Sequence, residues 1–200
     1  LYFNIAPDRD LLLALTVMSS RGLTYEGKYR KLIAPKISPD HEDSIWSIEA
    51  KYLPEDKITK LKRWLINFSE DMDINHKTHL SAQYFRVSDA QYFNEIARIS
   101  SDDKTLKSFL KLSFNDADED LSLEILTEDE QVVNAGTPVY TRALEGSISK
   151  TFNADSKTPM NFTLTATKFD HDIESKESGV RTHSDLGISR ELNIEYPKIT

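Results

Sequence analysis

The sequence predicts an α+β protein, with a helix-containing N-terminal half and an antiparallel β-rich C-terminal half that forms a sandwich or a partly open barrel. Residues 108–126 show the first reason for this prediction, because two runs of alternating apolar and polar side chains flank the acidic residues 115–120. That pattern is typical of a β-hairpin. The second reason is that helical spacing dominates before this hairpin, whereas alternation with a period of two dominates after it.

Three helices are predicted in the N-terminal half. The first starts at Pro7 and stops at Gly22, since proline suits a first helical turn and glycine suits a C-terminal cap. The second covers residues 54–68, where apolar side chains recur every three or four positions. The third covers residues 88–99 and begins with a Ser-x-x-Gln capping box.

Strands are predicted wherever apolar and polar residues alternate. The expected strands outside the central hairpin cover residues 46–52, 80–87, 139–144, 147–152, 162–166 and 188–196. Residues 170–185 are rich in acids and are predicted to be a mobile loop. The chain divides into an α+β region, residues 1–105, and a β-rich region, residues 106–200, or forms one continuous domain.

Composition excludes several classes of protein. The chain has no cysteine, which excludes disulfides and thiolate zinc sites, and its formal net charge of −8 disfavours nucleic-acid binding. The longest apolar run, Leu11 to Val17, is too short for the roughly 20 residues of a membrane-spanning helix. These features predict a soluble, cytoplasmic protein without membrane association.

One motif resembles the PD…ExK signature of metal-dependent nucleases. Asp40 follows a proline, and Glu49 and Lys51 lie two residues apart on the polar side of a predicted strand. The resemblance implies that the carboxylates of Asp40 and Glu49 hold Mg²⁺ while Lys51 positions or activates water. Asp40 and Glu49 are close in sequence, however, which hardly leaves room for the strand that carries the first aspartate in that family.

Two further groups of charged residues are candidate binding sites. Lys60 and Arg63 share the solvent side of the predicted helix 54–68, where they could meet a phosphate group or a nucleic acid. Asp116, Asp118 and Asp120 have the spacing of calcium ligands in an EF-hand loop. The glycine and the glutamate that complete such a loop are missing, so a solvated turn is the simpler interpretation.

These observations favour a non-enzymatic protein-interaction or structural module that has an unidentified protein partner and no cofactor. The loops at residues 115–120 and 170–185 are its expected recognition surfaces. The alternatives are a Mg²⁺-dependent nuclease that uses Asp40, Glu49 and Lys51, and a phosphate- or nucleic-acid-binding module that uses the basic helix.

Overall fold

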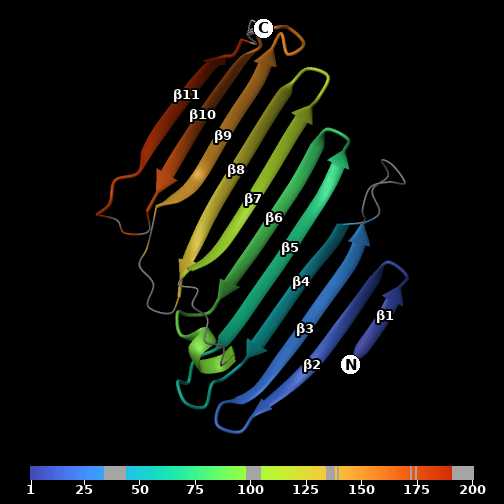
Figure 1. Cartoon of the computed structure of the whole chain (residues 1–200). Helices are drawn as coiled ribbons and strands as arrows, with labels where there is room; N and C mark the ends of the chain where they lie inside the picture. Colours follow the sequence, from blue (N-terminus) through green and yellow to red (C-terminus); the bar gives the residue numbers. More distant parts are fainter. Residues whose placement is uncertain are drawn as a thin grey trace, which may run out of the picture.

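The described residues of the chain fold into one antiparallel sheet of eleven strands, arranged in the order in which they follow one another along the sequence. The structure is a computed structural model, and Figure 1 shows its sheet as a single twisted layer of tilted strands. The structure describes residues 1–33, 44–97, 105–133, 138, 140–171, 173 and 175–190. The strands are β1 (Tyr2–Ala6), β2 (Arg9–Met18), β3 (Gly22–Ile33), β4 (Ser44–Leu53), β5 (Arg63–Asn75), β6 (Thr78–Val87), β7 (Thr105–Asp116), β8 (Leu121–Val132), β9 (Thr141–Phe152), β10 (Met160–Asp170) and β11 (Gly179–Ile188).

Alternation along the strands gives the sheet two chemically different faces, because successive side chains of a strand point to opposite sides. Residues that are opposite one another in an antiparallel pair lie on the same side, so the strand register extends each face across the sheet. The polar face carries, among others, Glu26, Lys51, Glu124, Ser147 and Thr165. The apolar face carries, among others, Leu13, Leu112, Leu123, Ile148 and Leu164.

The predicted α+β class is wrong, because strands make up 71% of the structure and helical residues 3%. Residues 7–21 and 54–68 form strands and turns, and the sole helical element among the described residues is the short π-helix η1 (Phe93–Ala97). Every strand pairs with its neighbours in sequence, so one sheet takes the place of the expected helical half. The helical spacing within residues 54–68 misled because Trp64 and Leu65 are successive residues of β5 that point to opposite faces.

Other sequence predictions were closer to the structure. The hairpin at residues 108–126 is confirmed by β7 and β8, which pair from Thr105 opposite Val132 to Asp116 opposite Leu121. The strand at residues 46–52 is confirmed by β4. The loop predicted at residues 170–185 is wrong over its second part, since β11 begins at Gly179, and most of the last predicted strand lies outside the described residues.

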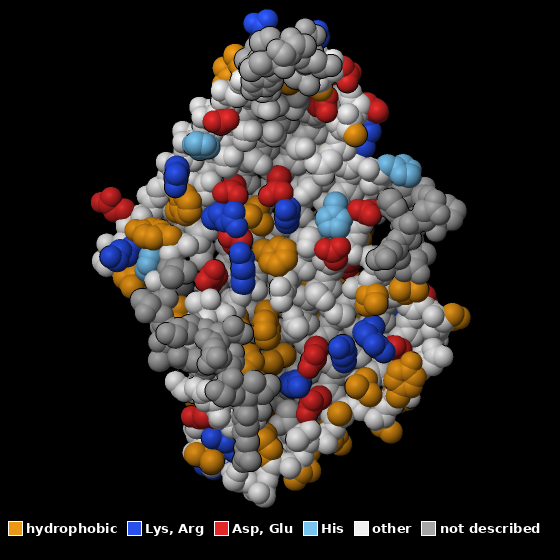
Figure 2. Space-filling view, viewed as in Figure 1, with side chains coloured by type: hydrophobic (Ala, Val, Ile, Leu, Met, Phe, Trp, Pro, Cys, Tyr) orange, Lys and Arg blue, Asp and Glu red, His pale blue; other side chains and the backbone are white. Residues whose placement is uncertain are grey.

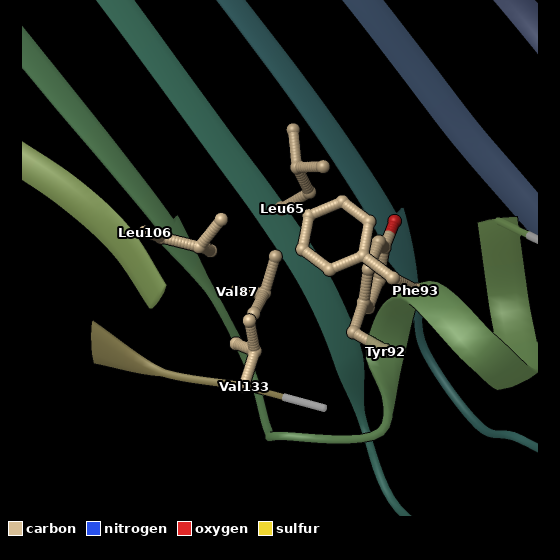
Figure 3. Packing of buried hydrophobic residues seen from close by; sticks show 6 residues of the cluster. All are labelled: Leu65, Val87, Tyr92, Phe93, Leu106 and Val133. Atoms are coloured by element: carbon tan, nitrogen blue, oxygen red, sulfur yellow. The ribbon is translucent and has the colours of Figure 1, made fainter. Parts of the chain in front are cut away.

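The buried apolar cluster lies where η1 folds back over the polar face (Figure 3). Phe93 packs edge-to-face on Tyr92 and Phe85, with ring centroids 5.7 and 6.0 Å apart. The cluster consists of Leu65, Val87, Tyr92, Phe93, Leu106 and Val133, with Phe85 and Ile96 packed against it. This core is small for a sheet of this size, so most apolar side chains of the molecule lie elsewhere.

The β6–β7 pair changes its bonding along its length. Backbone pairing joins Thr78–Gln83 of β6 to Phe109–Phe114 of β7 and ends there, although β6 continues to Val87. Beyond that point, side chains bond the β6 backbone. The Ser108 hydroxyl accepts from the Phe85 amide at 3.1 Å, and Gln131 of β8 accepts from the Val87 amide at 2.9 Å and donates to its carbonyl at 2.7 Å. We call this stretch the side-chain seam.

No helix among the described residues is both long enough and apolar enough to cross a membrane. The predicted boundary between residues 1–105 and 106–200 stays a prediction, although β6 and β7 pair across it.

Candidate functional site: the two faces of the sheet

The apolar face is exposed to an extent that is unusual for a folded protein. Leu15 has 65% of its surface exposed, Val17 79%, Ile125 55% and Leu186 62%. Within the described residues, no second sheet or helical layer covers this face. Water-soluble proteins rarely expose apolar patches above a few hundred Å², because each Å² of apolar surface in water costs roughly 25 cal/mol.

The strand register makes the apolar face continuous from strand to strand. In one row, Leu80 of β6 lies opposite Leu112 of β7, which lies opposite Ile125 of β8. A second row runs through Phe114, Leu123, Ile148 and Leu164 of β7, β8, β9 and β10. The exposed apolar residues therefore form a band across the sheet and are not scattered singly.

The polar face, in contrast, has partners within the chain. Figure 2 views the face on which η1 lies and shows acidic and basic side chains next to each other across it. Arg142 donates to Glu128 at 2.6 and 2.7 Å and to Glu145 at 2.7 Å, and Thr167 donates to the other oxygen of Glu145 at 2.7 Å. The Ser149 and Thr163 hydroxyls are 3.2 Å apart on the same face.

At one end of the sheet, a network of buried charges ties several connections together. Arg63 at the start of β5 is 2% exposed, and its Nη2 donates to Asp89 Oδ1 at 2.8 Å. Its Nη1 lies 3.0 Å from Glu95 Oε2 and 3.4 Å from Asp56 Oδ2. Arg21 of the β2–β3 turn reaches the same two acids, at 2.5 Å for Asp56 and 3.2 Å for Glu95. We call these five residues the Arg63 network.

Asp56 organises the β4–β5 connection within this network. Its carboxylate accepts hydrogen bonds from the Ile58 amide and the Thr59 hydroxyl, both at 3.0 Å, and from Arg21. Burial alone raises the pKa of Asp56, but the hydrogen bonds from Ile58, Thr59 and Arg21 outweigh burial and hold this pKa below its usual value. Asp56 is therefore an anion at neutral pH that holds the turn between β4 and β5.

The structure describes two of the three residues of the predicted nuclease site. Glu49 and Lys51 lie on the polar face of β4, where the Lys51 ammonium is 3.3 Å from Glu49 and 3.4 Å from Glu26. Lys51 is thus occupied by two carboxylates of its own chain. Asp40, the expected first ligand of Mg²⁺, lies outside the described residues.

Lys60 and Arg63 do not share a solvent-exposed helix face. Lys60 sits in the β4–β5 connection with a positive φ of 62°, and its exposed ammonium is 3.6 Å from Glu55. Arg63 is buried in its network, as described above. The segment is a turn and the start of a strand, so the spacing that placed both residues on one helix face does not apply.

Two aspartates of the 115–120 turn lie next to a lysine of the neighbouring turn. Lys77 lies 2.7 Å from Asp116 and 3.7 Å from Asp118, and the hydrogen bond with Asp116 raises the pKa of Lys77. Asp120 ends the turn with a positive φ of 48°. In the described part of the chain, no three His, Cys, Asp or Glu residues are grouped so that they could hold a metal ion.

Sequence reasoning missed both functional features of the molecule. Alternation indicated apolar faces but not what covers them, and the Arg63 network joins residues from separate connections that are up to 74 positions apart. Alternation alone did not indicate a wide sheet, because the strands that it predicted, such as residues 162–166, are shorter than those of the structure, such as β10 with 11 residues.

Comparison with known proteins identifies the family. The family described as "LptD: LPS transport system D" matches residues 61–200. The LPS-assembly protein LptD of Vibrio vulnificus strain YJ016 is 27% identical over 206 residues, covering 98% of this chain and 25% of that protein. The same protein of Idiomarina loihiensis is 25% identical over 94% of this chain and 24% of its own length. That of Cupriavidus pinatubonensis is 32% identical over 48% of this chain and 11% of its own length.

These matches correct several predictions. The cytoplasmic localisation and the absence of a membrane are wrong, because the LptD homologues are outer-membrane proteins of LPS assembly. The nuclease and the phosphate- or nucleic-acid-binding module are wrong as well; of the predicted function, its non-enzymatic character is loosely compatible with this family. The chain spans about a quarter of the length of its Vibrio and Idiomarina relatives. Because the family match covers most of the sequence, this chain belongs to the LPS transport system D (LptD) family.

Proposed function

We propose that this chain forms part of the membrane-spanning wall of an outer-membrane protein that assembles lipopolysaccharide. The observation that carries the proposal is the exposed apolar face of a single-layer sheet, which is stable only in contact with an apolar medium. The names of the relatives and the family described above support the same conclusion.

The dimensions of the sheet support this role. A tilted strand needs about 9–11 residues to cross the hydrocarbon layer of a bilayer. Strands β2, β6 and β10 have 10, 10 and 11 residues, and β10 pairs with both of its neighbours along nearly its whole length. Paired backbones are required there, because no water in the hydrocarbon layer can bond an open amide or carbonyl.

The two faces then have different surroundings. The apolar face contacts lipid chains. The polar face lines the space that the wall encloses, where its hydroxyls and ion pairs can contact water or the saccharide part of a passing glycolipid. In this role the protein binds a glycolipid and lets it pass, but it catalyses no reaction. The role therefore requires no catalytic residue and no cofactor.

Spin labels placed along one strand test this arrangement. Residues 1–200 contain no cysteine, so single cysteines at positions 121 to 126 of β8, introduced one at a time into a cysteine-free form of the full-length protein in a bilayer, report each position separately. We expect labels at 121, 123 and 125 to collide mainly with dissolved oxygen, which concentrates in lipid. Labels at 122 and 124 should collide mainly with a water-soluble nickel chelate, whereas the label at 126, where Leu126 is buried, should collide little with either reagent. Equal accessibility at all six positions would reject the lipid-facing assignment.

A cellular experiment tests the link to lipopolysaccharide. In cells depleted of their own LptD, we expect the full-length protein with Leu123→Arg to restore the barrier against bulky hydrophobic antibiotics poorly, because a charge then faces lipid. Ser122→Arg on the opposite face is the matched control and should restore it. If both variants restore the barrier and surface lipopolysaccharide equally, the proposed role of the apolar face is wrong.

A further inference from the structure

A hollow on the polar face is not accounted for by the role proposed above. It lies between strands β2 to β6 and the segment that contains η1, and has a volume of about 380 Å³. One part of its lining is apolar and the other is polar. The apolar part consists of Met18, Leu65, Phe85, Tyr92, Phe93 and Ile96. A cavity of this size, with an apolar wall and a few polar groups, is typical of sites for small molecules.

Two polar atoms in the lining are buried without a hydrogen-bond partner. They are the Thr24 hydroxyl oxygen and the Asn67 side-chain carbonyl oxygen, and Thr24 as a whole is 4% exposed. Buried polar atoms are nearly always paired, so each unpaired one indicates a missing partner. The Asn67 oxygen can only accept a hydrogen bond, so its missing partner is a donor.

The charges next to Asn67 indicate what kind of donor fits. Glu49 lies opposite Asn67 in the β4–β5 register. Lys51 is shared between Glu49 and Glu26, at 3.3 and 3.4 Å, so two carboxylates face one ammonium and leave an excess negative charge. Burial raises the pKa of Tyr92 to about 12, so this residue is neutral at physiological pH and adds no charge.

The aromatic rings of the lining also favour a cation. Phe85 lies opposite Asn67 in the β5–β6 register, and Phe93 packs edge-to-face on it. Aromatic faces attract an ammonium group, and the same rings offer an apolar surface to a hydrocarbon chain. The hollow therefore combines a hydrogen-bond acceptor at Asn67, an excess of negative charge and an aromatic wall.

We propose that this hollow binds a small amphiphilic amine, whose ammonium donates to the Asn67 carbonyl oxygen beside Glu49 and whose hydrocarbon part packs against Phe85, Phe93 and Ile96. The site is separate from the lipid-facing surface and does not depend on the transported molecule. Thr24 offers a second hydrogen-bonding position for a ligand that carries a further polar group.

Calorimetric titration of the full-length protein in phosphatidylcholine nanodiscs tests this site with n-hexylammonium as the probe. We expect saturable binding of one hexylammonium per chain, and no saturable binding of hexanoate or hexan-1-ol, which have the same chain length but a negative or neutral head. Equal saturable binding of hexanol would overturn the requirement for a cation. Heat that also arises with empty nanodiscs, with no saturable part due to the protein, would overturn the site itself.

Substitutions at position 67 separate the site from general folding effects. Asn67→Leu should weaken hexylammonium binding about tenfold, as expected for the loss of one charge-assisted hydrogen bond, whereas Asn67→Asp should strengthen it. Asn161→Leu on β10, on the same face but far from the hollow, is the matched control and should leave binding unchanged. If Asn67→Asp folds with the native circular dichroism spectrum and binds no more tightly than the parent protein, the assignment of the ammonium to Asn67 is wrong.

Discussion

The side chains of the two faces differ in where they find their partners. On the polar face, Arg142 finds Glu128 and Glu145 within the chain, and the Arg63 network buries its charges at one end of the sheet. On the apolar face, residues such as Val17 and Ile125 remain largely exposed. The polar face is thus stabilised from within, whereas the apolar face depends on its surroundings, and substitutions should reveal this difference.

Removing Arg63 should produce the largest effect. We expect Arg63→Ala to lower the free energy of unfolding by about 3–5 kcal/mol, because Asp56 and Asp89 would be left as partly or fully buried charges without their partner. Urea unfolding in lipid vesicles, followed by tryptophan fluorescence, measures the change. Arg30→Ala is the matched control: Arg30 bonds Asp10 but is half exposed, so its loss should change the free energy of unfolding far less. Equal losses for the two variants would contradict a special role for the network.

A charge on the apolar face should have the next largest effect. Leu164→Arg is expected to lower the free energy of unfolding by about 2–4 kcal/mol near the middle of a bilayer, where an arginine loses its hydration. Thr165→Arg lies one residue further on β10 and faces the polar side, next to Ser147 and His183, so its cost should be small. The same vesicle assay compares the two. A larger loss for the threonine variant would reverse the assignment of the faces.

The side-chain seam offers a smaller test. Gln131→Ala removes both hydrogen bonds to the Val87 backbone, and each group left unpaired costs roughly 1–3 kcal/mol. We expect faster hydrogen exchange at the Val87 amide and little change at amides of the backbone-paired part of β6. Gln83→Ala, at the end of that paired part, is the control. Unchanged exchange at Val87 would show that the Gln131 side chain does not hold the seam.

The smallest expected effect concerns Asp56, and it shows only when the pH is lowered. Because the pKa of Asp56 is lowered in the folded state, its contribution to stability is present above the pKa of the unfolded state and is lost as the pH falls through the folded pKa. Stability should therefore decline below about pH 4, the ordinary value for aspartate, and Asp56→Asn should flatten this decline. Vesicle unfolding at pH 7, 5, 4 and 3 measures both slopes. Identical slopes would exclude Asp56 as a source of the acid dependence.

The strands with strict alternation could be predicted, and β2 could not. In β4 and in the β7–β8 hairpin, polar residues separate apolar ones, so the period of two is visible. In β2, apolar residues occupy both faces: Leu12 and Ala14 share the polar face with Lys28 and Glu26, while their neighbours face the other side. Without a polar residue at every second position, the segment resembles a buried helix.

The candidate site was hidden for a different reason. Alternation shows that a strand has one apolar side, but a protein core and a lipid layer select the same pattern. The Arg63 network was invisible because Arg21, Asp56, Arg63 and Glu95 meet only after the sheet has formed. The charged residues at 54–68 are spaced as on a helix. This spacing predicted the wrong neighbours for Lys60 and Arg63.

The order of the strands has a consequence for how such a wall can be built. Among the described strands, each pairs only with the strands before and after it in the chain. Hairpins can therefore be added one at a time onto an existing edge, because each new strand pairs with the strand that precedes it in the chain. The insertion or loss of a whole hairpin would change the width of the wall while preserving every other pairing, which gives this architecture a simple route to grow or shrink during evolution.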